Sequence, residues 1–278
     1  MRKKPWFRGL HASPPGPLGL ILAIVPFLLV VVIYIVASDL RHTANPADKL
    51  LPGLSQMLHS MKALLLEPDK RTGQILLVAD TLASLKRLGL GVVIAAVAGL
   101  LLGVNIGLLP GLRALQLPFV TFISMIPPLA ILPILFIALG VGEFAKVALI
   151  TIGIFPMITR DIYLAASQVP REQVVKALTL GASQLGVIYR VVLPQILPRL
   201  IDTVRLSLGP AWLFLIASEA IAATNGLGYR IFLVRRYLAM DVIIPYVFWI
   251  TLIGFLLDWL LRLLMNWRYP WYQRGGEK

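Results

Sequence analysis

The chain has 278 residues, 58% of them hydrophobic, and a formal net charge of +13. So large a hydrophobic share excludes an ordinary soluble domain and indicates an integral membrane protein. The basic residues mostly lie in short segments beside apolar runs, a pattern typical of membrane proteins and not of nucleic-acid binding. The absence of cysteine excludes disulfides and thiol chemistry. The three histidines share no ligand spacing, so no metal site is predicted.

The first predicted span is residues 18–37, an uncharged run long enough to cross a bilayer. The basic tail before it places the N-terminus in the cytoplasm. Because the run is too long for a signal-peptide core and lacks a convincing cleavage site, we expect an uncleaved helix. Residues 38–87 are predicted to form an external segment that includes an amphipathic helix over 54–66. At its end, Lys86 and Arg87 are expected to extend towards the outer membrane surface.

The remaining membrane core is predicted over residues 88–264, and its first helix is the second span, 88–109. Small residues recur in that helix every four positions, at Gly91, Ala95, Gly99, Gly103 and Gly107. This spacing places them on one face, where small side chains let helix backbones approach closely in lipid. The stripe therefore predicts a tightly packed interior helix.

The third span, 115–139, is interrupted by several prolines, including Pro127 and Pro128. Such breaks are tolerated in a membrane only where protein or a cavity satisfies the freed backbone groups. Two interpretations stay open for this pair. It forms either a kink that lines a solute pathway or a bend needed only for packing.

An outer turn carrying Glu143 and Lys146, which are spaced to pair on one helix face, leads into the fourth span, 146–157. The fifth span, 204–223, contains Trp212, Ser218 and Glu219. A carboxylate within an apolar span is a candidate functional group. Its alternative role is that of a structural hydrogen-bond acceptor towards a neighbouring helix or the outer loop.

The segment between the fifth and sixth spans is expected outside, yet it carries Arg230, Arg235 and Arg236, against the charge rule. These arginines either contact an acidic binding protein or an anionic substrate, or extend to lipid phosphates. The sixth span is 242–264. The prediction is an all-α membrane protein of about six spans, with both termini cytoplasmic and residues 1–278 forming one transmembrane domain.

Residues 161–200 form a polar, basic segment between the fourth and fifth spans, on the predicted cytoplasmic side. A spaced pattern lies within it: Ala177, Gly181, Ala182, Ser183, Val191, Leu193 and Pro194. Glycine permits a sharp turn between two helices, and Pro194 fixes a helix boundary or a first turn. The alternative interpretation of the segment is an ordinary helix-turn-helix surface loop.

This pattern resembles the "EAA" loop of permease subunits of bacterial ABC importers. Val175 and Lys176 stand where that family has its Glu and first Ala, and Val191 stands where it has Ile. The missing Glu removes any salt bridge specific to that residue. The resemblance implies a short cytoplasmic helix that docks into a groove of an ATPase subunit.

From residue 76 to residue 264, the order of motifs is similar to the nitrate/sulfonate/taurine group of these permeases. The residues concerned are Leu85, Arg87, Pro127, Pro128, Pro133, Gly140, Gly142, Glu143, Lys146, Phe155, Pro156, Leu206, Gly209, Trp212, Glu219, Gly226 and Gly228. The resemblance implies the type I importer permease (MetI-like) fold and a location in the bacterial cytoplasmic (inner) membrane. It also implies a homodimer, a pair of ATPase subunits and a periplasmic or lipid-anchored binding protein.

The sequence contains no P-loop motif, so the chain is not expected to hydrolyse ATP, and ATP and Mg²⁺ are assigned to the ATPase partner. No catalytic constellation is visible, which indicates a transport subunit and not an enzyme. The alternative is an ion-coupled secondary transporter, for which Glu219 is the only deep carboxylate.

Two lines of reasoning conflict over the substrate. The three outer arginines favour an anion on electrostatic grounds. The stretch 230–246 is similar to a urea-carboxylase-associated subgroup, which implies a urea- or guanidine-like solute, and a guanidinium cation would be repelled by those arginines.

Overall fold

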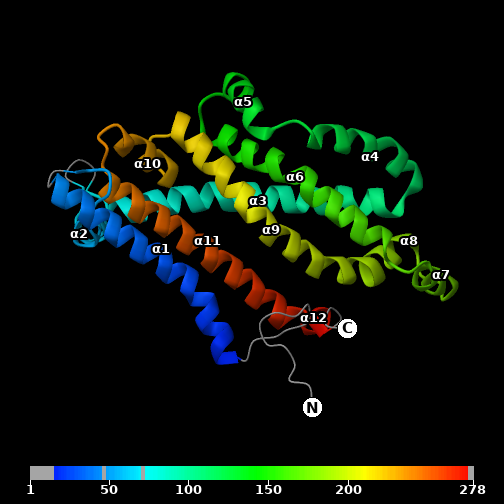
Figure 1. Ribbon diagram of the computed structural model, residues 1–278. Coiled ribbons are helices and arrows are strands. Elements are labelled where there is room, and N and C mark those ends of the chain that lie inside the picture. Colours follow the sequence, from blue (N-terminus) through cyan, green and yellow to red (C-terminus); the bar gives the residue numbers. More distant parts are fainter. Residues whose placement is uncertain (1–15, 46–47, 70–72, 275–278) are drawn as a thin grey trace, which may run out of the picture.

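The computed structural model describes residues 16–45, 48–69 and 73–274, which form helices joined by short connections, with no strand among them (Figure 1). In chain order the helices are α1 (Gly16–Ala44), α2 (Leu54–Leu66), α3 (Leu76–Leu108), α4 (Pro110–Ser124), the 3₁₀ helix η1 (Pro128–Ile131), α5 (Leu132–Leu139), α6 (Glu143–Ser167), α7 (Arg171–Thr179), α8 (Gln184–Val187), the π-helix η2 (Ile188–Val192), α9 (Leu193–Ala222), α10 (Leu227–Arg235), α11 (Met240–Arg268) and α12 (Pro270–Arg274). The all-α prediction is confirmed.

The long apolar helices agree with the predicted spans. Five of the described stretches are long and apolar enough to cross a membrane: α1, α3, α6, the run Gln184–Ala222 and α11. A sixth span results if α4 and the η1–α5 segment are counted together, and these two parts meet at 82°. The break falls at Pro127 and Pro128, as the prolines predicted, because proline cannot continue a helix interior.

The α3–α6 seam is the tightest helix contact, and it confirms the small-residue stripe. A Cβ on Gly99 would lie 2.7 Å from Cγ2 of Ile158, and a Cβ on Gly107 would lie 2.4 Å from Cβ of Ala166. Both separations are too short for two carbon atoms, so glycine is required where the backbones meet. The core of the fold forms where α9 packs against this pair.

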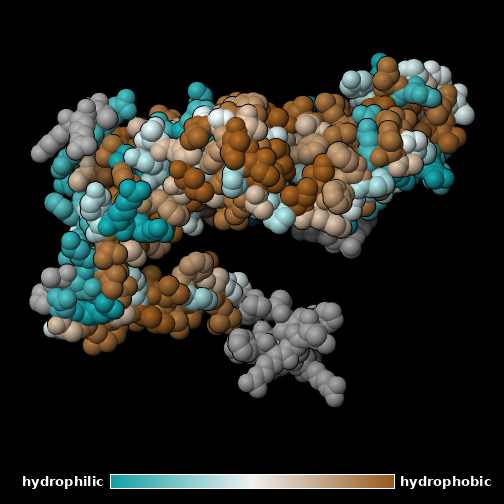
Figure 2. Space-filling view, turned by 90° about the horizontal axis from the view of Figure 1, so that it is seen from above, coloured by the Kyte–Doolittle hydropathy of each residue, from teal (hydrophilic) through white to brown (hydrophobic). Residues whose placement is uncertain are grey.

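Helix α1 stands apart from that core. Figure 2 shows it as a largely apolar arm separated from the body, and none of the residues in its most apolar stretch is buried. Its attachment lies near its C-terminal end, where the Tyr34 hydroxyl donates to the Pro52 carbonyl at 2.7 Å and the Ser38 hydroxyl donates to the Leu51 carbonyl at 3.0 Å. The surface of α1 is therefore available to lipid.

The remaining helices define two ends of the molecule. Helices α2 and α10 lie at one end and α7 and α8 at the other, while α3, α6 and α9 run between them (Figure 1). In agreement with the charge pattern, we call the first the outer end and the second the inner end. Polar residues gather towards the ends, and apolar residues dominate the middle (Figure 2).

Candidate functional site

An open cavity of about 560 Å³ lies between α4, η1, α6 and α9. Its lining is Ile123, Ser124, Ile126, Pro128, Ile131, Ile152, Gly153, Pro156, Met157, Arg160, Asp161, Leu164, Thr203 and Leu206. Most of these side chains are apolar. Pro128 belongs to the lining, so the break in the third span forms one wall of the cavity. A pathway role for Pro127 and Pro128 stays a prediction.

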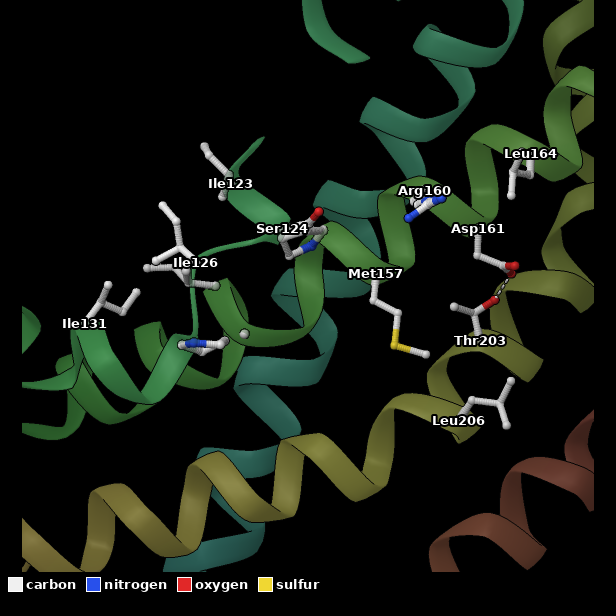
Figure 3. Close-up of a pocket in the computed structure, with 14 residues that line it drawn as sticks. Ile123, Ser124, Ile126, Ile131, Met157, Arg160, Asp161, Leu164, Thr203 and Leu206 are labelled. Carbon is white, nitrogen blue, oxygen red and sulfur yellow. Dashed lines mark hydrogen bonds between the residues drawn. The ribbon is translucent and has the colours of Figure 1, made fainter. Parts of the chain in front are cut away.

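The inner end of the cavity is polar. Figure 3 shows Arg160, Asp161 and Thr203 there, with Ile126 and Ile131 at the opposite end. Asp161 accepts two hydrogen bonds from Arg199, at 2.7 Å from Nε and 2.6 Å from Nη2, and a third from the Thr203 hydroxyl. Sequence reasoning used Arg160 and Asp161 only as a mark of the cytoplasmic side, because neither belongs to a recognisable motif.

The inner loop contains the turn predicted at Gly181. Gly181 adopts a positive φ of 86°, its amide donates to the Leu178 carbonyl at 3.0 Å, and the Ala182 amide donates to the Ala177 carbonyl at 3.0 Å. These two bonds make the Schellman motif that ends α7. The Ser183 hydroxyl then accepts from the Gly186 amide at 3.1 Å and caps α8.

Beyond the turn, the chain rises into the membrane without a break. Helix α8 continues through the π-helix η2, which contains Val191, into α9, where Leu193 and Pro194 are the first two residues. Single π-helical turns are rare and are frequent at functional sites. The Gln195 side-chain amide donates to Gln173 at 3.0 Å and so ties α9 to α7.

Apolar side chains are exposed on this loop. Leu180 is 88% exposed and Leu185 is 66% exposed. We call the exposed set the apolar loop residues: Val175, Leu178, Leu180, Leu185 and Tyr189. Exposed apolar groups on a polar, basic segment mark a surface suited to contact with another protein.

Charged and polar groups from distant parts of the sequence meet at the outer end. We call this group the outer cluster: Asp80, Ser84 and Arg87 of α3, Glu143 and Lys146 of α6, Glu219 of α9, and Arg230 of α10, with the backbone of residues 225–228. Three carboxylates and three cations make its formal charge zero. Opposite charges at bonding distance offset the cost of removing them from water.

Glu219 is fully buried within the outer cluster. Its carboxylate accepts from the Ser84 hydroxyl at 2.8 Å, from Nη1 of Arg87 at 2.7 Å and from the Gly228 amide at 2.9 Å. This geometry matches the second of its two interpretations, a hydrogen-bond acceptor towards a neighbouring helix and the outer loop.

Arg87 differs from its sequence-based expectation. Its side chain is 3% exposed and does not extend to the outer surface, whereas Lys86 is exposed. The guanidinium donates to Glu143 at 2.8 Å from Nη2 and to the Asn225 carbonyl at 2.9 Å from Nη1. The carboxylate of Glu143 also accepts from Lys146 at 2.9 Å, so the pair expected in the outer turn is confirmed.

Arg230 also belongs to the outer cluster, which separates it from its two neighbours. Its Nε donates to Asp80 at 2.8 Å, and Asp80 further accepts from the Gly226 amide at 2.9 Å and the Tyr246 hydroxyl at 3.2 Å. Arg235 and Arg236 are exposed. The predicted outer contact with an anion or an acidic protein is therefore open to those two arginines, while Arg230 is bonded inside the protein.

Steric crowding explains why glycine occupies positions 226 and 228 of the outer turn. Gly226 has φ of 119°, and a Cβ there would lie 2.5 Å from Oε1 of Glu219. A Cβ on Gly228 would lie 2.8 Å from the Ile216 carbonyl oxygen. Their absent side chains let the turn approach the carboxylate closely enough to donate its amides.

Two of the predicted polar residues of α9 lie away from the cavity. Ser218 is buried and donates to the Leu215 carbonyl at 2.8 Å. Trp212 is also buried, and its Nε1 has no hydrogen-bond partner among the described residues. Within the same residues, no group of three or more His, Asp or Glu side chains is placed to hold a metal ion.

Comparison with known proteins gives consistent matches. Residues 89–269 match the profile of a family described as binding-protein-dependent transport system inner membrane component. The taurine transport system permease protein TauC of Escherichia coli is 36% identical over 190 residues, which cover 68% of this chain and 69% of that protein. A probable ABC transporter permease protein of Brucella abortus is 34% identical over 81% of this chain and 88% of that one.

Two further matches extend the comparison. The bicarbonate transport system permease protein CmpB of Synechococcus elongatus is 32% identical over 68% of each chain. A solved inward facing structure of the MetNI methionine ABC transporter aligns with a TM-score of 0.58 over 66% of this chain and 92% of the other, at 19% identity. The structural likeness at this identity concerns the fold, and it agrees with the predicted type I importer permease fold.

Proposed function

Because the chain belongs to the family of binding-protein-dependent transport system inner membrane components, we propose that it forms the solute pathway of an ATP-driven importer and couples to a separate ATPase through residues 161–200. Membership makes it the permease component of an ABC importer, a multi-pass inner-membrane protein that transports and is not an enzyme. The observation that carries the coupling proposal is the exposure of the apolar loop residues at the inner end.

The contacts of the inner loop support a mechanical role. Helix α7 is tied to α9 through Gln173 and Gln195, and α9 is tied to α6 through Arg199 and Asp161. Helices α6 and α9 both line the cavity. A displacement of α7 by an ATPase would therefore reach two walls of the pathway, in the manner of rigid-body movements of packed helices.

The relatives guide the choice of substrate and partners. They are named for taurine, bicarbonate and, as a putative assignment, aliphatic sulfonates. We assign a small polar solute to this chain, which is either nitrate-, sulfonate- or taurine-like or urea- or guanidine-like. The assembly would contain a second copy of the chain, two ATPase subunits that carry ATP and Mg²⁺, and a binding protein at the outer end.

An ion-coupled transporter gains no support from the site. That alternative needed Glu219 as a proton- or sodium-binding carboxylate. Glu219 is instead bonded to Arg87, Ser84 and the Gly228 amide.

The test is co-purification of the tagged chain with the ATPase subunit of its importer. Leu180→Asp places a charge where an apolar contact is proposed, and we expect association about tenfold weaker or more, from the roughly 1.5–3 kcal/mol that a buried leucine contributes. Since Leu180 is 88% exposed, the thermal stability of the chain itself should not change.

A matched control is Tyr237→Asp, which changes a residue that is 72% exposed at the outer end. It should retain the ATPase. If Leu180→Asp retains the ATPase equally well, residues 161–200 are not the coupling element.

A further inference from the structure

One charge at the inner end of the cavity has no partner in the protein. Arg160 lines the cavity, its side chain is exposed there, and it forms no ion pair or side-chain hydrogen bond with any residue that the structure describes. Most other charged groups near the ends of the spanning helices are paired, as in the outer cluster. An arginine is always ionised at physiological pH, so this charge persists.

The neighbouring carboxylate does not neutralise Arg160. Asp161 is held by both donor edges of Arg199, at 2.7 Å and 2.6 Å, and by the Thr203 hydroxyl. Two parallel hydrogen bonds of this kind make a strong, oriented pair. The charges of Asp161 and Arg199 cancel, and the cavity is left with the single positive charge of Arg160.

The rest of the cavity strengthens that charge. Its opposite end is formed by Ile126 and Ile131, and its α9 wall includes Leu206 (Figure 3). Apolar walls exclude water and lower the effective dielectric constant, so an unpaired cation attracts anions and repels cations more than it would at an open surface. A volume of about 560 Å³ falls within the usual range of small-molecule sites.

From this geometry we propose that Arg160 binds the anionic group of the transported solute at the inner end of the cavity, and that the solute is a small oxyanion and not a guanidinium-like cation. The inference rests on the proposed pathway function. The planar guanidinium matches sulfonate, carboxylate and nitrate oxygens in pairs, which gives orientation as well as attraction. Selectivity for an anion over a cation is thereby assigned to Arg160 in the cavity, whereas the sequence indicated the three outer arginines.

A solute explains the cavity better than a lipid headgroup does. The lining of α6 extends from Arg160 back to Ile152, a rise of about 12 Å along the helix. A phosphate held at the membrane surface would contact Arg160 and leave this depth empty. A solute that leaves towards the inner end must pass Arg160.

The chain offers a direct test because it contains no cysteine. Ser124 lines the cavity and is exposed, so Ser124→Cys gives one reactive thiol there. The chain, purified with its ATPase and placed in liposomes, is labelled with an anionic sulfonatoethyl and a cationic trimethylammonium-ethyl methanethiosulfonate reagent. The ratio of the two rates measures the sign of the local potential.

We expect the anionic reagent to be favoured and Arg160→Gln to lower the rate ratio by about tenfold or more, because one unit charge within the same partly apolar cavity is worth more than about 1 kcal/mol. Arg160→Lys should preserve most of the ratio. The matched control Arg268→Gln removes an exposed charge of the inner end that is not part of the cavity, and it should leave the ratio unchanged.

Free solutes supply the second readout. Methanesulfonate should slow labelling of the thiol when Arg160 is present and not in Arg160→Gln, while methylguanidinium should have no effect. An unchanged ratio in Arg160→Gln would overturn the proposal, and so would protection by methylguanidinium. A ratio that depends on Arg160 only in liposomes containing anionic lipid would assign the residue to lipid phosphate and also overturn it.

The two proposals fail in different measurements. Arg160→Gln should co-purify with the ATPase as the unchanged chain does. Loss of the ATPase in Leu180→Asp therefore tests coupling, and the rate ratio tests the anion site.

Discussion

The outer cluster and the inner end of this protein differ in whether their charged and apolar side chains have partners within the chain. At the outer end, Asp80, Arg87 and Glu219 are buried. Arg87 pairs with Glu219 and Asp80 pairs with Arg230, and the outer cluster as a whole is neutral. At the inner end, Leu180 and Leu185 are exposed and Arg160 has no partner among the described residues.

The difference separates structure from interaction. Groups that are satisfied within the chain hold helices together, because a buried charge without its partner is very costly. Groups that the chain leaves unsatisfied are free to contact something else. The unsatisfied groups of the inner end are therefore available to other molecules, whereas the outer cluster joins α3, α6, α9 and α10.

The largest effect is expected from breaking the outer cluster. Glu219→Ala leaves Arg87 buried without one of its two carboxylates, and removal of one partner from a buried pair destabilises by about 3–5 kcal/mol. Thermal unfolding of the detergent-purified chain should show a large loss of stability. Glu67→Ala, at an exposed glutamate near the same end, should have no measurable effect. Equal stability of the two variants would mean that the outer cluster does not hold the fold.

A smaller effect is expected from the turn of the inner loop. Gly181→Leu forces a side chain into a φ of 86°, which costs about 1–2 kcal/mol, although the space around it is open. We expect the chain to remain folded while the orientation of α7 changes, so ATPase association and stimulation should fall. Gly111→Leu is the control, since that glycine also has open space and no positive φ. Full ATPase stimulation in Gly181→Leu would contradict a role for this turn.

The smallest effect is expected from an exposed ion pair of the inner half. Arg262 contacts Asp258 at 3.0 Å, and its side chain is 57% exposed. Surface pairs contribute about 0–1 kcal/mol, so Arg262→Gln should change the unfolding temperature little. A loss as large as that of Glu219→Ala would show that exposure does not distinguish the two ends.

Local patterns predicted the helices and the seam correctly. The stripe from Gly91 to Gly107 depends only on the helical repeat, and the bend at Pro127 and Pro128 depends only on the proline ring. Each feature is decided within one helix. The turn at Gly181, which has a positive φ, was predictable for the same reason, because the end of a helix depends only on residues close in the sequence.

The outer cluster was not predicted as a unit, because it requires knowing which helices meet and at what height. From the sequence, Arg87 was expected at the surface, because the sequence does not show that the fold places the carboxylates of Glu143 and Glu219 beside it. A signal was present in α3: Asp80, Ser84 and Arg87 are spaced four and three residues apart, and Arg87 lies four residues before Gly91, so they continue the face of the glycine stripe. Polar residues on an interior face imply polar partners, and that inference would have marked them.

The cavity could not be predicted from the sequence either. Its lining comes from four elements, and the state of Arg160 depends on whether Arg199 and Thr203 occupy Asp161. The residues of α6 cannot reveal that Asp161 pairs with the distant Arg199 and not with its neighbour Arg160. The start of α9 shows the same effect. The helix begins at Leu193, before the predicted start of the span at residue 204, and its first turns bond to Asp161 of α6 through Arg199 and Thr203.

The close packing of α3 against α6 at the glycine stripe joins the two helices into one unit. Because the α3 glycines carry no side chains, Ile158, Ile162 and Ala166 of α6 pack directly against the α3 backbone, and the two helices are expected to move together. Helix α6 alone is about 37 Å long, and it ends close to the α7 turn on one side and carries Glu143 of the outer cluster on the other. If an ATPase displaces the inner loop as proposed, the pair of helices would carry that displacement to the outer end as a tilt.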